Sequence, residues 1–121
     1  MGIKFLDTYA LIEISRGNPN FMHLLNQDFV ILDLILAEFY NVLIRKQEEK
    51  IANFWYKRLE GYVNIASLPI LIKAMKYRYD NRKQNLSFFD AVGYIYAREN
   101  NMKFVTGDKE FKDKDGVEFI K

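Results

Sequence analysis

Short apolar runs that alternate with helical patterns constrain the fold of this 121-residue chain more than any other feature. Each run is short enough for a buried strand, and the stretches between the runs carry apolar residues at helical spacing. The predicted strands cover residues 3–6, 29–32, 62–66, 103–106 and 117–120. This alternation predicts an α/β fold whose parallel sheet is covered by helices on both faces.

The stretches between the runs predict helices with recognisable ends. Ser87 is expected as an N-cap, Pro69 suits a first helical turn, and Gly17 and Gly61 follow helix ends. The predicted helices cover residues 8–15, a segment after Pro19, residues 33–46 and 48–60, a segment from near Pro69, and residues 87–100. No linker, repeat or low-complexity tract divides the sequence, so residues 1–121 are expected to form a single domain.

The composition removes several kinds of chemistry. The chain has no cysteine, which excludes disulfides, zinc–thiolate sites and cysteine nucleophiles. His23 is the only histidine, so a mechanism that needs a histidine pair is excluded as well. Carboxylates, hydroxyls and cations remain. The formal net charge of +2 permits nucleic-acid binding but does not argue for it.

Charged residues interrupt the two apolar stretches that could otherwise be a membrane-spanning helix or a signal peptide. Residues 29–44 form the most apolar stretch, but Asp33 and Glu38 break it, so it is not expected to span a bilayer. Asp7 and Glu13 break the opening apolar run, which therefore does not resemble a signal peptide. We expect a cytoplasmic protein with no membrane partner.

Two aspartates stand where predicted strands end. Asp7 follows the first strand, and Asp108 follows the fourth. Ligands of open parallel sheets bind at the carboxyl ends of the strands. The two threonines of the chain, Thr8 and Thr106, each lie within two residues of one of these aspartates, and a hydroxyl there can order a metal-bound water or a phosphate oxygen. The alternative is that both aspartates are turn or cap residues.

Two further acids lie on predicted helices. Asp90 is the fourth residue from Ser87, so its alternative role is a capping box that complements the helix dipole. Gly93 shares its face, and because a helical glycine costs about 1 kcal/mol relative to alanine, it indicates the close approach of another backbone. Glu38 shares a helical stripe with Arg45, which favours a solvated face with local ion pairing as the alternative.

Considered together, Asp7, Glu38, Asp90 and Asp108 offer the oxygen ligands that hard divalent cations such as Mg²⁺ prefer. A cation held by carboxylates can polarise a phosphodiester, activate water and stabilise the leaving oxygen. This chemistry needs neither cysteine nor histidine. The four acids therefore favour metal-dependent hydrolysis of phosphodiester bonds.

Five segments stand in a recognisable order from one end of the chain to the other. They cover residues 5–12, 37–39, 90–92, 104–111 and 116–120. The most specific is the fourth, which contains Thr106-Gly107-Asp108. In this order and spacing the chain resembles PIN-domain ribonucleases, and most closely the small toxins of VapBC toxin–antitoxin pairs.

The resemblance implies a Rossmann-like three-layer α/β/α sandwich with a mainly parallel central sheet. It implies that Asp7, Glu38, Asp90 and Asp108 form a site for Mg²⁺ or Mn²⁺, and that Thr106 assists them. It also implies an endoribonuclease that acts as a toxin on RNA, forms a homodimer and is silenced by a cognate antitoxin. The alternative is a PIN-like domain that binds RNA or a partner without cleaving it.

RNA beside an acidic pocket needs cations for its phosphates. A basic and aromatic cluster comprises Lys73, Lys76, Tyr77, Arg78, Tyr79, Arg82 and Lys83. The cluster suits phosphate contact and base stacking, and equally an ordinary solvated helix face with inward tyrosines. Glu110 stands where many relatives carry aspartate, and two roles remain open for it, an auxiliary acid or an exposed side chain.

An excess of large apolar residues in the early helices predicts a docking surface for a second copy and for the antitoxin. The residues concerned are Phe21, Leu24, Leu25, Phe39, Leu43 and Phe54. The alternative for much of this set is the hydrophobic core.

A receiver-like signalling module is the rival from another functional class, and the residues exclude it. Such modules need a pair of acids at the first strand and a lysine at the end of a late strand. Here Thr8 follows Asp7, and Asp108 stands in the place of that lysine.

Overall fold

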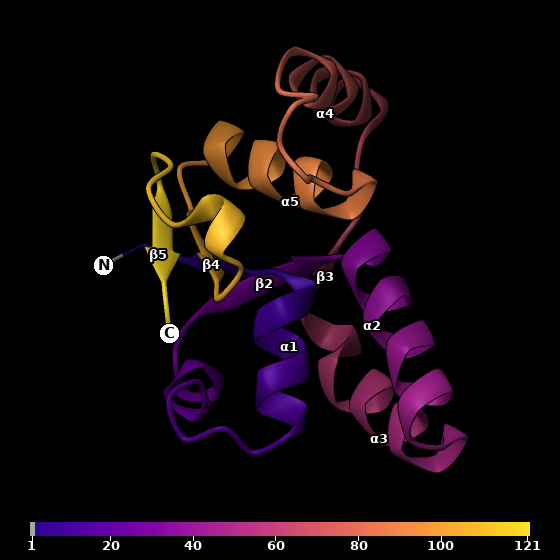
Figure 1. Ribbon diagram of the computed structural model, residues 1–121. Helices are drawn as coiled ribbons and strands as arrows, with labels where there is room; N and C mark the ends of the chain where they lie inside the picture. The colour runs from indigo at the N-terminus through magenta and orange to yellow at the C-terminus, as the bar shows by residue number, and fades with distance from the viewer. Residues whose placement is uncertain (1) are drawn as a thin grey trace.

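The computed structural model describes residues 2–121, which form a five-stranded sheet in the order β3-β2-β1-β4-β5 (Figure 1). Every pair of neighbouring strands is parallel. The strands are β1 (Lys4–Leu6), β2 (Phe29–Leu32), β3 (Val63–Asn64), β4 (Lys103–Thr106) and β5 (Val117–Phe119). The predicted α/β class with a parallel central sheet is therefore confirmed.

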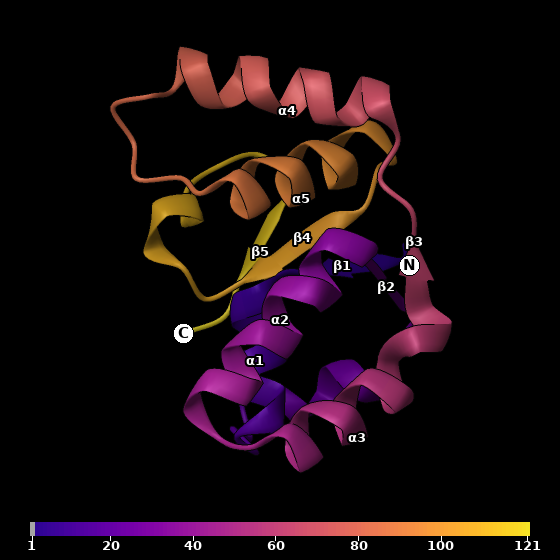
Figure 2. The ribbon, with the colours of Figure 1, turned by 90° about the vertical axis from the view of Figure 1, so that its right-hand side faces the viewer.

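Helices cover both faces of this sheet. They are α1 (Thr8–Ser15), α2 (Asp33–Lys46), α3 (Glu49–Leu59), α4 (Leu68–Asp80) and α5 (Phe88–Glu99). Figures 1 and 2 show α5 on one face with α4 outside it, and α1, α2 and α3 on the other, which is the predicted three-layer sandwich. Within residues 2–121, no helix combines the length and the apolar character needed to cross a membrane.

Two predicted elements differ from the observed ones. In place of a helix after Pro19, the chain forms a short 3₁₀ helix, η1 (Met22–Asn26). Phe21 and Leu24 are buried three residues apart, which suits a 3₁₀ turn because side chains at i and i+3 share one side of it. The predicted strand at 62–66 shortens to β3, since Tyr62 ends the 3₁₀ helix η2 (Glu60–Tyr62) and Ser67 caps α4.

Gly93 allows α5 to lie against aromatic rings that cover β1 and β4. Phe5 and Phe104 are fully buried and stack with their ring centroids 5.8 Å apart. A Cβ atom at position 93 would lie 3.0 Å from Phe5 Cε1 and 3.3 Å from Phe104 Cε1. The close approach predicted for Gly93 is therefore real, but aromatic side chains make it and not the backbone that we expected.

Most of the predicted docking residues belong to the core. Phe21, Leu24, Phe39 and Leu43 are at most 2% exposed, so the prediction that they form an open surface is wrong. They are buried because α1, η1 and α2 close over the sheet on this side. Phe54 is the exception, since 57% of it is exposed.

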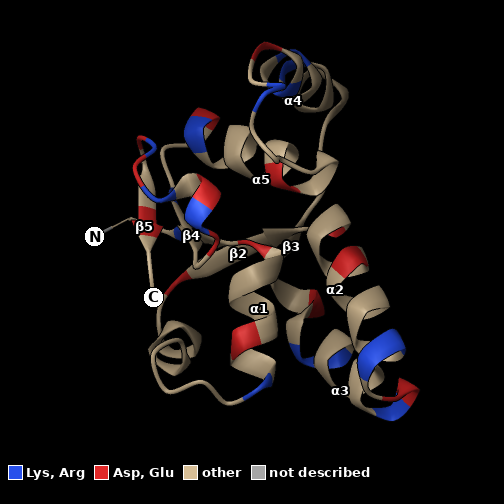
Figure 3. Cartoon of the chain, viewed as in Figure 1, with Lys and Arg blue, Asp and Glu red and all other residues tan. Residues whose placement is uncertain are grey.

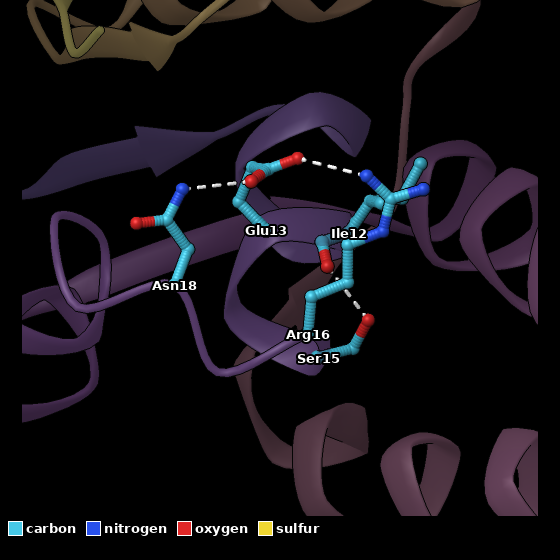
Figure 4. A network of polar contacts seen from close by, with 5 residues as sticks. All are labelled: Ile12, Glu13, Ser15, Arg16 and Asn18. Atoms are coloured by element: carbon cyan, nitrogen blue, oxygen red, sulfur yellow. Dashed lines mark hydrogen bonds and ion pairs between the residues drawn. The ribbon is translucent and has the colours of Figure 1, made fainter.

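Polar contacts fix the C-terminal end of α1 (Figure 4). The Glu13 carboxylate accepts hydrogen bonds from the Asn18 amide at 2.8 Å and from the Arg16 guanidinium at 3.3 Å. The Ser15 hydroxyl donates to the carbonyl of Ile12 at 2.7 Å. These contacts satisfy groups in the last turn and hold the loop that follows against the helix.

η3 (Lys109–Phe111) is a third 3₁₀ helix, and it lies between β4 and β5. Phe111 is fully buried and packs on Phe104, with 4.8 Å between the ring centroids. This contact anchors the connection that leaves the end of β4, where Asp108 stands.

Candidate functional site

The register of β1 and β4 places Asp7 beside Thr106. Leu6 pairs with Val105, so the next residue of each strand lies at the same carboxyl edge of the sheet. The backbone N–H of Asp7 donates to the carbonyl of Val105 at 3.3 Å. Asp7 is 3% exposed and Thr106 is fully buried.

Asp7 is also the N-cap of α1. Its Oδ1 accepts a hydrogen bond from the backbone N–H of Ala10 at 2.8 Å. Burial raises the pKa of Asp7 to about 8, against the opposing effect of hydrogen bonds from Thr106 and Ala10. The charges of Asp90 and Asp108 add to this rise. The capping role predicted as the alternative is therefore present, and it coexists with a strongly perturbed carboxyl group.

Glu38 lies half-buried on α2 and faces α1 rather than solvent. The Thr8 hydroxyl donates a hydrogen bond to Glu38 Oε1. Burial raises the pKa of Glu38, the bond from Thr8 lowers it, and the charge of Asp90 raises it further. Among residues 2–121, Arg45 forms no ion pair with Glu38. The expected ion pairing on a solvated stripe is therefore wrong.

Asp90 forms the capping box predicted at the start of α5. The Ser87 hydroxyl accepts from the backbone N–H of Asp90 at 3.0 Å, and Asp90 Oδ2 accepts from the backbone N–H of Ser87 at 3.0 Å. Burial raises the pKa of Asp90, and the charge of Asp108 raises it further. The hydrogen bonds from Ser87 and the positive charge of Arg78 act in the opposite direction.

Asp108 lies in the turn after β4 and contacts Thr106, the last residue of that strand. The Thr106 hydroxyl accepts from the backbone N–H of Asp108 at 3.0 Å. Asp108 Oδ1 in turn accepts from the backbone N–H of Glu110 at 3.0 Å and so caps η3. Thr106 thus contacts both aspartates at this edge of the sheet.

The four predicted acids share one electrostatic environment. The charges of Asp90 and Asp108 raise the pKa of Asp7, and the charge of Asp90 raises the pKa of Glu38. None of the four pairs with a lysine or arginine within the described residues. Figure 3 shows acidic segments on α2, on α5 and beside the end of β4, and basic segments on α4, on α3, at the end of α2 and on the short helix between β4 and β5.

This donor set suits a hard cation in its chemistry, because its side-chain donors are carboxylate and hydroxyl oxygens. Its side chains do not form a ready-made cage. Within residues 2–121, no group of three or more histidine, aspartate and glutamate side chains is arranged to hold a metal ion. Each carboxylate is instead held by a backbone N–H or by the hydroxyl of Thr8.

Comparison with known proteins agrees with this fold. Residues 4–117 match the PIN domain. The chain belongs to the PIN domain family. A comparison with curated protein sequences finds no match.

Solved structures share the fold of this PIN domain. The toxin VapC20 of Mycobacterium tuberculosis, which cleaves the sarcin–ricin loop, superposes with a TM-score of 0.83 at 17% identity, over 99% of this chain and 100% of its own. A toxin–antitoxin complex from Klebsiella pneumoniae gives 0.74 at 18% identity, over 95% of each chain. VapBC2 from Rickettsia felis, bound to a DNA fragment from its promoter, gives a TM-score of 0.71 at 17% identity. The match covers 99% of this chain and 100% of the other.

The basic cluster of the PIN domain divides into two parts. Lys73 pairs with Glu99 at 2.9 Å and Lys76 with Asp80 at 2.6 Å, so both lysines are compensated on an exposed face. Tyr77 packs inward on Tyr94, with 5.5 Å between their ring centroids. For these residues the solvated-face interpretation is correct. Arg78 and Arg82 of the cluster differ from the lysines, because neither forms an ion pair within the described residues.

Sequence reasoning missed the partners of two site residues. Thr8 is one of only two threonines, but the sequence does not predict its hydrogen bond to Glu38, which lies thirty positions away. Arg78 belonged to the basic cluster, and only the tertiary structure places its charge beside Asp90. Glu110 is half-buried in η3, and its backbone N–H, rather than its carboxylate, contacts Asp108.

Proposed function

We propose that this PIN domain is a metal-dependent endoribonuclease, and that it is the toxin of a toxin–antitoxin pair. The observation that carries the proposal is the grouping of Asp7, Glu38, Asp90 and Asp108 around the carboxyl ends of β1 and β4 without a cationic partner among the described residues. The shared fold with a toxin that cleaves the sarcin–ricin loop supports RNA as the substrate.

Mg²⁺ or Mn²⁺ is the cofactor that we propose. Asp7, Glu38, Asp90 and Asp108 would hold it, after drawing closer together than their present hydrogen bonds place them. A bound cation supplies a Lewis acid for the phosphate and a more acidic water. None of the four acids is ion-paired with a lysine or arginine among the described residues, and this supports the assignment, because a bound cation would supply the positive charge that buried carboxylates otherwise lack.

Hydroxyl groups of the chain orient these carboxylates. Thr106 contacts the side chain of Asp7 and the backbone of Asp108, while Thr8 holds Glu38. Ser87 holds Asp90 through both halves of the capping box. Partners of this kind fix the orientation of ligating side chains, so the role of the hydroxyls is to hold the acids ready. Until a cation arrives, Asp7 retains a proton at neutral pH, which reduces the repulsion within the group.

Incubation of the protein with defined RNAs in Mg²⁺, Mn²⁺ or EDTA, followed by mapping of the products, tests the proposal. Endonucleolytic cuts are expected with either metal and not with EDTA. Asp7→Asn and Asp108→Asn should each abolish most of the activity, while Asp113→Asn, which alters an exposed acid beyond the site, should not. Cleavage that persists undiminished in EDTA would contradict the proposed metal dependence. RNA binding without any cleavage would favour the non-catalytic alternative.

A protein antitoxin is the partner that we propose, and an apolar groove between α2, α3 and β3 supports it. The groove measures about 530 Å³ and is lined by Leu36, Ala37, Tyr40 and Val63, with Asp33 and Glu60 also in its wall. Its shape and its acids suit an apolar segment that carries basic residues. Co-purification with the product of a neighbouring reading frame tests this partner, and Ala37→Arg should weaken the complex. Because the proposed substrate is RNA and the proposed partner is an antitoxin, we also propose a cytoplasmic location.

A homodimer is also proposed, through a different surface from the one that the sequence predicted. Ile65, Leu68 and Ile72 lie at the N-terminal end of α4 and are 73%, 68% and 61% exposed. Figure 2 shows that α4 packs on α5 with one side and leaves the other uncovered. Apolar side chains gathered in this way mark association surfaces.

A further inference from the structure

Arg78 and Asp90 hold opposite sides of one peptide group. Arg78 Nε donates to the carbonyl oxygen of Leu86 at 2.9 Å. The N–H on the other side of that peptide bond belongs to Ser87, and it donates to Asp90 Oδ2 at 3.0 Å. The basic end of α4 and the acidic site therefore meet at a single peptide unit in the loop before α5.

A recess lies on the Arg78 side of this peptide group. It measures about 480 Å³ and lies between the C-terminal half of α4 and the loop of residues 81–87. Arg78, Tyr79, Arg82, Gln84 and Asn85 contribute to its wall, and no acidic side chain does so among the residues that the structure describes. The recess is therefore polar and basic, whereas the adjoining site is acidic.

Among the described residues, the two arginines of the recess are not ion-paired, although the charge of Arg78 also acts on Asp90. Lys73 and Lys76 of the same helix each pair with an acid, but within residues 2–121 neither Arg78 nor Arg82 forms an ion pair. Each arginine uses one nitrogen to donate to a backbone carbonyl, Arg78 to Leu86 and Arg82 to Tyr79 at 3.0 Å. These bonds orient the guanidinium groups and leave further N–H donors for an anion.

Tyr79 and Arg82 also form a flat, exposed pair. The Arg82 guanidinium carbon lies 4.4 Å from the centroid of the Tyr79 ring, and 63% of Tyr79 is exposed. Unpaired nucleobases stack on aromatic rings and on arginine planes in this manner. Among the described residues, two arginines without an ion pair, a recess and a stacking surface therefore occur together. Only the Leu86–Ser87 peptide group separates the recess from Asp90.

We infer that this recess binds single-stranded RNA beside the cleavage site, with Arg78 and Arg82 on backbone phosphates and one base stacked on the Tyr79–Arg82 pair. The inference rests on the proposed function, because it takes RNA as the substrate. Carboxylates that lack an ion-paired lysine or arginine repel a phosphodiester, so a strand that enters needs cationic contacts close to them. The shared peptide group means that a strand held in the recess leads directly to Asp90. A duplex keeps its bases stacked on one another and cannot use the exposed pair.

Binding without cleavage tests the inference on the intact chain. The parent protein carries Asp7→Asn and is kept in EDTA, and fluorescence anisotropy follows its binding to a labelled single-stranded RNA oligonucleotide over a range of salt concentrations. Arg82→Ala should weaken binding and lower the slope of log K against log salt concentration by about 0.7, the value for one phosphate contact on a single strand. Tyr79→Leu should weaken binding by about five- to a hundredfold, because it removes the stacking ring. It should leave the slope unchanged, because Arg82 keeps its bond to the backbone carbonyl of residue 79 and its charge.

Arg58→Ala is the matched control, since Arg58 is an exposed arginine on α3, away from the recess. It should change neither the affinity nor the slope. Thermal melting verifies that each variant is folded, and Tyr79→Leu serves as the independent test if an arginine variant is not.

The inference is overturned if folded Arg82→Ala and Tyr79→Leu bind RNA as the parent does, if the parent binds no RNA, or if duplex and single-stranded RNA bind equally well. Weakened binding in these variants supports the recess even where the unmutated protein shows no cleavage with Mg²⁺ or Mn²⁺. In that case the nuclease proposal fails and the RNA site stands.

Discussion

The ring of Tyr9 occupies the space that a side chain at Gly107 would need. A Cβ atom at position 107 would lie 2.2 Å from Tyr9 Cε1 and 2.9 Å from the carbonyl oxygen of Ile120. The first turn of α1 and the turn that carries Asp108 therefore approach each other closely only because position 107 is glycine. This contact lies between the segments that carry the two aspartates at the ends of β1 and β4.

Gly107→Ala is expected to destabilise the protein by about 1–3 kcal/mol, the usual cost of overpacking, and to reduce cleavage by displacing Asp108. Tyr9→Ala in the same chain should restore part of the stability, since it removes the nearer contact and leaves the one with Ile120. Chemical denaturation measures the effect. Gly61→Ala is the control, because nothing lies within 4 Å of a Cβ atom there. Equal stability of Gly107→Ala and wild type would contradict the close approach.

The stability of the metal-free protein should fall as the pH rises. Asp7 has a folded pKa of about 8 against an ordinary value of 3.8, so between these values the folded state binds more protons than the unfolded state. The contribution of Asp7 to stability is then fully present below about pH 4 and is lost as the pH rises towards 8, and the raised pKa values of Glu38 and Asp90 act in the same direction.

Urea unfolding in EDTA at several pH values between 5 and 8 measures this decline. Asp7→Asn should flatten it, because the asparagine cannot ionise, whereas Asp113→Asn should leave the slope as in wild type. A slope that persists unchanged in Asp7→Asn would show that other groups cause it.

Asp90→Asn separates the capping role of Asp90 from its proposed role as a ligand. Asparagine can still accept the hydrogen bond from Ser87, and the loss of one negative charge relieves repulsion from Asp108. The melting temperature in EDTA should therefore stay unchanged or rise. The stabilisation produced by millimolar Mn²⁺ should largely disappear, because a bound ligand adds RT ln(1 + [L]/Kd) to the native state.

Four thermal melts check this expectation, those of wild type and Asp90→Asn, each with EDTA and with Mn²⁺. A purely structural cap gives the opposite pattern. The variant would then lose roughly 0.3–1 kcal/mol of dipole complementarity in both conditions, and both proteins would show equal shifts with Mn²⁺.

Thr106→Val should reduce both stability and cleavage. Valine has nearly the shape of threonine but leaves the backbone N–H of Asp108 without its acceptor and Asp7 with only the donor from Ala10. A buried polar group that loses its partner costs about 1–3 kcal/mol. Thr106→Ser keeps the hydroxyl and should retain most of the activity. If serine and valine behave alike, the hydroxyl has no part in holding the acids.

Ile72→Glu should convert the proposed homodimer into a monomer without unfolding it, because Ile72 is 61% exposed in the single chain. Light scattering at high micromolar concentration measures the oligomeric state. Phe54→Glu changes an equally exposed apolar residue on α3 and should leave the dimer intact. A wild-type protein that scatters as a monomer at these concentrations removes the homodimer proposal.

The sequence by itself determined the order of the strands and helices along the chain and the local geometry at several helix ends. The capping box of Ser87 and Asp90 is an example, since both hydrogen bonds lie within four residues and follow from helix geometry alone. The positions of Asp7 and Asp108 at strand ends were also readable, because parallel strands bring their carboxyl ends to one edge.

The tertiary structure alone decided which of these groups contact one another. Glu38 lies in a stripe that periodicity marks as solvated, yet packing of α2 on α1 half-buries it against Thr8. Phe21 and Phe39 could equally have formed a surface or a core, because apolar character does not state what covers it. Arg78 and Asp90 meet at the Leu86–Ser87 peptide only because α4 folds back over α5. Local hydrogen bonding is encoded over a few residues, whereas burial and charge proximity depend on how distant elements pack.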